Sequence, residues 1–107
     1  MSKQKRISDY VKIGRLQTGE LNKITDVKGI RVGHSTIKNE DNRTGVTVIL
    51  PSEKNMFTNK FEAASFVLNG YGKSVGLIQI DELGLLEAPI ALTNTLNVGK
   101  VLDAMIE

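Results

Sequence analysis

Short apolar runs separated by turn-forming and polar residues make up most of the chain after position 29. Val46–Leu50 is apolar or β-branched throughout and is followed by Pro51, which is typical of a buried strand. Ile30–Ile37 alternates between two faces, as an extended segment does. Val75–Ile80 and Ala88–Leu92 are bounded by turn-forming residues and fit strands that are covered on both faces. The pattern therefore predicts four strands.

One amphipathic helix is predicted from about residue 96 onward, with Thr95 or Asn97 as its cap. Its apolar positions recur at i, i+3, i+4 and i+7 and are Val98, Val101, Leu102 and Met105. We expect these side chains to pack on the sheet. The sequence reaches Glu107 without a Gly, Asn or Pro stop and without a basic last turn. We therefore expect 1–107 to be the amino-terminal part of a longer protein, truncated inside a helix.

Two weaker signals lie near the amino end. Ser8–Gly14 fits one short helical turn with Gly14 as its stop. Ile24–Val27 is followed by the turn-forming pair Lys28-Gly29, so we expect it to form a hairpin with Ile30–Ile37.

Composition excludes several classes of function. Hydrophobic residues make up 40% and charged residues 24% of the chain, as in globular domains. The net charge of +2 is too small to indicate nucleic-acid binding, and most of the positive excess lies in a basic amino-terminal extension, residues 1–21. Without cysteine there is no disulfide, thiolate metal site or cysteine nucleophile. With neither a signal peptide nor an apolar run long enough to span a bilayer, we expect a cytoplasmic protein without membrane contact.

Nucleotide binding and histidine chemistry both find little support in the sequence. Gly-Lys-Ser at 72–74 resembles the end of a phosphate-binding loop, but Val67 stands where that motif needs its first glycine. Val75 likewise replaces the last glycine of a dinucleotide fingerprint, which leaves a glycine turn. His34 cannot activate the adjacent Ser35, because neighbours on a strand point to opposite faces. A half-buried structural histidine is the favoured interpretation, and no metal site is expected.

Three residues are candidates for substrate binding, namely Glu82, Glu87 and Asn94. A carboxylate next to an apolar run could hold the ammonium group of a substrate, which applies to Glu82, Glu87 and also Asp81. Asn94 leaves a predicted strand and could donate a hydrogen bond to an oxyanion. Capping of nearby turns and of the last helix explains the same residues, and this alternative stays open. No catalytic residue is predicted.

Three blocks in this order carry a family resemblance: Asn22–His34, Arg43–Pro51 and Asn69–Gly99. They resemble the amino-terminal part of the DmpA family, the L-aminopeptidase/D-esterases with their β-peptidyl aminopeptidase relatives. The resemblance implies an α+β fold, part of an αββα sandwich like that of amino-terminal-nucleophile hydrolases. It also favours a strand at Phe61–Leu68, a segment whose pattern fits a helix equally well.

The resemblance also implies a mechanism that this segment cannot complete. Members cut their own precursor and use the newly exposed Ser or Thr as nucleophile, and that residue lies downstream of the blocks found here. We therefore expect the 107 residues alone to be inactive. The expected partners are a small peptide or an amino-acid amide or ester, the remainder of the parent chain and further copies in a homo-oligomer, with no cofactor. A related amide hydrolase or acyltransferase, or a stand-alone structural or binding module, are the alternatives.

Overall fold

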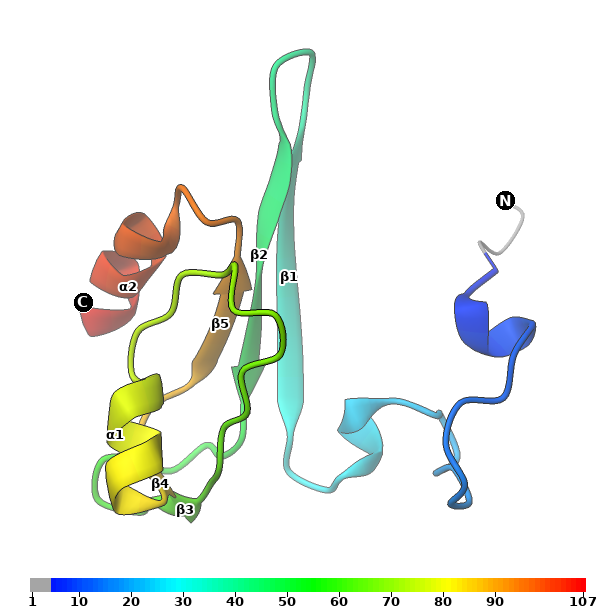
Figure 1. Ribbon diagram of the computed structural model, residues 1–107, viewed down its shortest axis with the longest axis horizontal. Helices are drawn as coiled ribbons and strands as arrows, with labels where there is room; N and C mark the ends of the chain where they lie inside the picture. The colour runs from blue at the N-terminus through cyan, green and yellow to red at the C-terminus, as the bar shows by residue number, and fades with distance from the viewer. Residues whose placement is uncertain (1–4) are drawn as a thin grey trace.

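A three-stranded antiparallel sheet and two helices form the centre of the molecule (Figure 1). The computed structural model describes residues 5–107. The sheet has the order β1-β2-β5, and β3 and β4 form a separate pair. The elements are η1 (Ile7–Asp9), η2 (Ile24–Asp26), β1 (Arg31–Lys38), β2 (Arg43–Leu50), β3 (Phe61–Glu62), α1 (Leu77–Leu83), β4 (Leu85–Leu86), β5 (Ile90–Thr93) and α2 (Val98–Ile106). The α+β class predicted from the sequence is confirmed.

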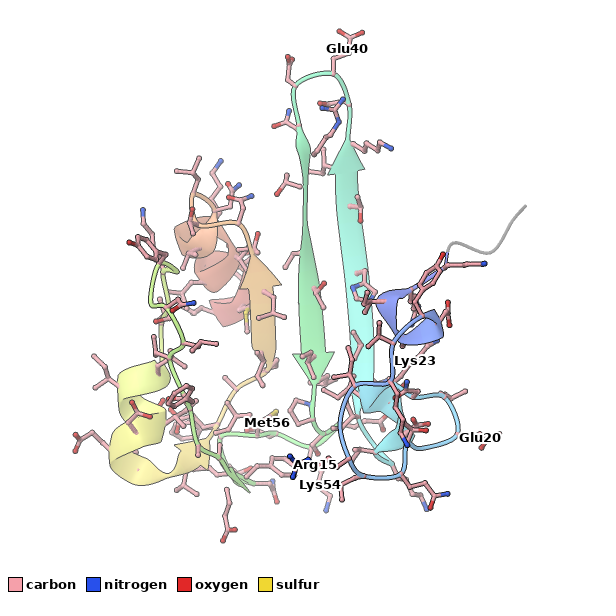
Figure 2. All side chains as sticks on the ribbon, turned by 45° about the vertical axis from the view of Figure 1, so that its right-hand side comes forward. Arg15, Glu20, Lys23, Glu40, Lys54 and Met56 are labelled. Carbon is pink, nitrogen blue, oxygen red and sulfur yellow. The ribbon has the colours of Figure 1, made fainter. Side chains whose placement is uncertain are left out.

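A long hairpin of β1 and β2 is the most regular part of the fold. Its register runs from Arg31 opposite Leu50 to Lys38 opposite Arg43. The turn between the strands closes because the side-chain oxygen of Asn39 accepts hydrogen bonds from the backbone N–H groups of Asp41 and Asn42, at 3.1 and 2.7 Å. Glu40, at the tip, points away from the rest of the molecule (Figure 2). The strands predicted at 30–37 and 46–50 are both confirmed.

The third strand, β5, pairs with β2 from Ile49 opposite Ile90 to Val46 opposite Thr93. It confirms the strand predicted at Ala88–Leu92. The observed strand starts later than predicted, at Ile90, and ends about one residue later, at Thr93. The hydroxyl of Thr93 donates a hydrogen bond of 3.0 Å to the carbonyl oxygen of Gly45, which fixes the end of β5 to the start of β2.

The prediction of a strand at Val75–Ile80 is wrong. Leu77–Leu83 forms helix α1 instead, and only Val75 and Gly76 precede it. The helix lies between two glycines in the left-handed region, Gly76 with φ 88° and Gly84 with φ 65°, and the N–H of Gly84 bonds to the carbonyl oxygen of Ile80. A left-handed glycine directly after the last turn is a common way to end a helix.

Two further predicted extended segments are also wrong. The strand expected at Phe61–Leu68 contains only the two residues of β3, because its partner β4 is equally short. The strand expected at Ile24–Val27 is the 3₁₀ turn η2. The Asp26 carboxylate accepts hydrogen bonds from the N–H groups of Leu21 and Lys23, at 2.9 and 3.0 Å, and so closes a turn instead of a hairpin strand.

The helical turn expected at Ser8–Gly14 is present only in its first part, as η1. The Asp9 carboxylate accepts a 2.8 Å hydrogen bond from the N–H of Arg6, and Gly14 has a positive φ of 88°. None of the helices within residues 5–107 combines the length and the apolar character that crossing a bilayer requires.

Helix α2 confirms the helix predicted at the carboxyl end. All four of its predicted apolar residues line a groove with β5 and α1, and the groove has a volume of about 490 Å³. The rest of the molecule is open. Met56, at 5% exposure, is the only buried hydrophobic side chain within residues 5–107 (Figure 2).

The surface and the dimensions of the chain show the same openness. The accessible surface is 9836 Å², whereas a compact monomer of 11.7 kDa exposes about 5,900 Å². The radius of gyration is 16.1 Å, against about 13 Å for a compact domain of this length. The hairpin, sheet and helices therefore have apolar faces that these residues leave uncovered.

Candidate functional site

The groove between α1, β5 and α2 is a concave surface formed by three elements of the fold. Its wall is mainly apolar, with side chains such as Leu77, Ile80 and Leu86 facing those of α2. Its polar lining residues are Lys73, Ser74, Gln79, Glu87 and Thr93. An apolar hollow with a few polar groups at its edge is the general form of a binding site. A hydrophobic core that lacks one of its layers has the same form.

Glu87 is the only one of the three predicted substrate-binding residues that lines the groove. Its Oε2 accepts a hydrogen bond of 2.8 Å from Lys60 Nζ. The same ammonium donates to the carbonyl oxygen of Phe57 at 2.6 Å and lies 4.0 Å from the centroid of the Phe57 ring. The ion pair thus fixes the loop after β2 to the loop before β5. Both side chains are about three-quarters shielded, with exposures of 29% and 26%.

The hydrogen bond from Lys60 lowers the pKa of Glu87 below its usual value of 4.5, and a second hydrogen bond from Gln79 acts in the same direction against the opposing effect of burial. Since the folded-state pKa is the lower one, the ion pair stabilises the fold fully above about pH 4.5 and loses this effect as the pH falls through the folded-state value.

We expect Lys60→Met to raise the pKa of Glu87 toward 4.5, because it removes the largest cause of the shift. The measurement is a pH titration of the Glu87 carboxyl carbon by NMR. Lys54→Met is the matched control, since Lys54 lies in the same loop and has no ion pair within residues 5–107. An unchanged titration midpoint in the Lys60 variant would show that the ion pair does not form in solution.

Glu82 and Asn94 lie elsewhere. Glu82 is exposed on α1 and is not part of the groove wall. The Asn94 side-chain oxygen accepts hydrogen bonds from the N–H groups of Leu96 and Asn97 at 3.0 and 3.1 Å, and its amide donates to the hydroxyl of Thr44. Asn94 therefore holds the backbone just before α2 in place and joins it to β2. Its use as an oxyanion donor stays a prediction.

His34 is exposed, so the expectation of a half-buried histidine is wrong. Every residue of β1 except Val32 is exposed, because the described residues leave the faces of this strand largely uncovered. His34 Nδ1 lies 2.8 Å from the hydroxyl of Thr47, its direct partner across the hairpin. Within residues 5–107 no group of His, Asp or Glu side chains is arranged to hold a metal ion.

Two interactions between distant residues had no signal in the sequence. The Ser65 hydroxyl donates a hydrogen bond to the Asp81 carboxylate, which joins the segment after β3 to α1. Lys60 reaches Glu87 from a loop that is mainly polar in the sequence. Both pairs depend on how the chain folds back on itself, and neither has a characteristic spacing.

Residues 22–107 match the profile of peptidase family S58. The chain belongs to this family. The match begins where the basic extension ends, and it confirms the resemblance to the DmpA family. The curated relatives include the β-peptidyl aminopeptidase BapA of Sphingosinicella xenopeptidilytica, 42% identical over 98 residues. The enzyme of the same name from Sphingosinicella microcystinivorans is 37% identical over 97 residues.

Two solved structures are also similar to this S58 chain. The PH0078 protein from Pyrococcus horikoshii OT3 has a TM-score of 0.84 at 48% identity over 91% of the chain. A Burkholderia sp. β-aminopeptidase has a TM-score of 0.79 at 47% identity over 90%.

The chain spans a minor part of each of these proteins. The two curated matches include 83% and 82% of this chain, but they include only 24% of the length of each relative. The chain covers 30% and 28% of the two solved chains.

Proposed function

We propose that these residues are the amino-terminal part of a self-processing cytoplasmic aminopeptidase. The complete enzyme hydrolyses amide or ester bonds after an amino-terminal residue of a small peptide or amino-acid derivative. Its nucleophile is a Ser or Thr that follows the segment described here, and the segment contributes part of an αββα sandwich and of the substrate site. The enzyme works as a homo-oligomer and needs no cofactor.

The observation that carries this proposal is the likeness to the Burkholderia β-aminopeptidase, with 47% identity and a TM-score of 0.79 over 90% of the chain. The TM-score shows that the two chains share the course of the backbone over this part. The names of both Sphingosinicella relatives point to the same activity. The uncovered faces of the sheet support the sandwich, since a sheet of this kind needs a layer on each apolar face.

Glu87 has the best position among the proposed substrate contacts, Glu82, Glu87 and Asn94. It lines the groove, and its ion pair with Lys60 shows that its carboxylate can hold an ammonium group there. An amino-terminal ammonium of the substrate would take the place of Lys60 Nζ, which is now 2.8 Å away. A stand-alone binding module is less well supported, because a module that folds alone buries more than one hydrophobic side chain.

A chimera tests the proposal. The matching segment of the Burkholderia β-aminopeptidase is replaced by residues 1–107, and hydrolysis of a β-amino-acid p-nitroanilide is measured. We expect the chimera to turn over this substrate, while the isolated 107 residues, as the control, show no turnover. A folded chimera without activity, or turnover by the isolated chain that is lost on changing one of its Ser or Thr residues, would contradict the proposal.

A further inference from the structure

Ala63–Gly76 is a long irregular segment that connects β3 to α1. Figure 1 shows it rising from β3 at the bottom of the view and returning down to α1. It is held at its start, where the N–H of Ala63 bonds to the carbonyl oxygen of Gly84 at 2.9 Å and Ser65 bonds to Asp81. Loops of this length without secondary structure are uncommon in compact domains and usually have a function.

The segment exposes large apolar side chains instead of burying them. Tyr71 is 97% exposed, Phe66 87% and Leu68 77%. Val75, just before α1, and Ile78, on its first turn, are 61% and 82% exposed. Single exposed apolar side chains are normal on protein surfaces, but a run of this kind marks an interaction site. We call the run from Phe66 to Ile78 the apolar segment.

The backbone of the apolar segment is open as well. Within the described part of the chain, residues 66–75 take part in no backbone hydrogen bond. Asn69 and Gly70 both have positive φ, of 58° and 27°, so the backbone changes direction here. Backbone groups that leave water must find partners. A protein chain that covers this segment can supply both apolar contacts and hydrogen bonds.

We propose that the apolar segment is the docking surface for the remainder of a full-length S58 chain. This inference rests on the proposed function. Two observations identify the occupant. The two solved structures with the same fold are more than three times as long, since this chain spans 30% of one and 28% of the other. The accessible surface of 9836 Å² also exceeds that of a compact monomer of this mass by more than half.

The charge of the surface fits an internal protein contact. Between Phe66 and Ile78 the only ionisable side chains are Tyr71 and Lys73, and Lys73 lies at the edge of the groove. A membrane or nucleic acid is recognised through several cations, which this segment lacks. Tyr and Phe are well suited to such a contact because they bury a large area and have few rotatable bonds.

The test compares side-chain accessibility in the isolated chain and in the chimera described above. Both are labelled with hydroxyl radicals at submicromolar concentration, and Tyr71 and Tyr10 are quantified by mass spectrometry. We expect labelling of Tyr71 to fall about tenfold in the chimera, as for a side chain at the centre of an interface. Tyr10, which is 68% exposed and precedes the family match, is the internal control and should keep its labelling.

A pair of substitutions tests the energetic role. Phe66 and Leu16 have the same exposure of 87%, but Leu16 lies outside the family match. We expect Phe66→Asp to lower the folding equilibrium constant of the chimera by about thirtyfold or more, the effect of a central interface residue. Leu16→Asp should change it less than about threefold, as for a surface position. Neither change should alter the circular dichroism of the isolated chain.

Equal labelling of Tyr71 in both proteins, or equal effects of the two substitutions, would overturn the inference. Protection of Tyr71 in the dilute isolated chain would assign the segment to a second copy instead, and an insoluble chimera would show that the surface does not fit the remainder. Turnover is a separate readout. A chimera that protects Tyr71 without hydrolysing substrate contradicts the proposed activity and leaves the docking surface standing.

Discussion

The isolated 107-residue chain is expected to associate at micromolar concentration. Light scattering coupled to size exclusion should give a mass well above 11.7 kDa or a polydisperse profile. The reason is the apolar surface that the fold leaves open. Only Met56 is buried within the described residues, and patches of more than a few hundred Å² are rare on soluble monomers. The open chain should also bind the dye ANS, as states with exposed apolar surface do.

The apolar segment provides the matched comparison for this experiment. Replacing Phe66 and Leu68 by Ser should reduce association, because both side chains are largely exposed and contribute little to the fold of the isolated chain. Lys73→Ser alters a polar neighbour in the same segment and should have little effect. A compact monomer with a sharp two-state melt would contradict the expectation. It would also make the stand-alone module the leading interpretation of this chain.

Gly45→Ala is expected to weaken the β1–β2 hairpin by about 1–3 kcal/mol, the usual range for overpacking. A Cβ atom at position 45 would overlap the backbone carbonyl oxygen of Ser35 and come within 3.2 Å of the Thr36 Cα. Both are main-chain atoms of β1, which cannot move without breaking ladder hydrogen bonds. Amide hydrogen exchange across β1 and β2 in the chimera measures the change as faster exchange.

Gly33→Ala is the control for this substitution. Gly33 lies in β1, and apart from Gly33 itself and its two chain neighbours no heavy atom lies within 4 Å of the position that its Cβ would take. The two variants therefore introduce the same methyl group into neighbouring strands of one hairpin. Equal exchange rates in both would show that the close approach at Gly45 is absent in solution.

The strands that the sequence predicted correctly are those whose pattern has one interpretation. Val46–Leu50 is β-branched and followed by a proline, so no helix competes. Ile30–Ile37 pairs with it through a turn whose polar side chains hydrogen-bond locally. Local chemistry is enough to specify a hairpin of this kind.

The strand predicted at Val75–Ile80 is wrong because its pattern also fits a helix. An apolar run this short fits a strand or one side of a helix, and periodicity alone does not separate them. The decisive signal was Gly84, which ends α1 in the left-handed conformation. The acids at 81 and 82 belong to the exposed side of that helix and not to a loop between strands.

The candidate site was less accessible to sequence reasoning than the fold. The placement of Glu87 depends on Lys60 and Gln79, which reach it from a distant loop and from α1. Asn94 does bond to the start of α2, as the capping alternative predicts, yet its bond to Thr44 joins the residue after β5 to β2. Interactions of this kind follow from the strand order, and the sequence carries no pattern that encodes it.

The strand order β1-β2-β5 also determines when each strand can find its partners during synthesis. The hairpin is complete once Leu50 has emerged from the ribosome, but Ile90, which begins β5, follows about forty residues later. At about 5–20 residues per second, β2 waits roughly 2–8 s for its second neighbour. During this time both edges of the hairpin are free to pair with another nascent chain. Slow codons between Leu50 and Ile90 would lengthen that period, and rapid translation of this stretch would shorten it.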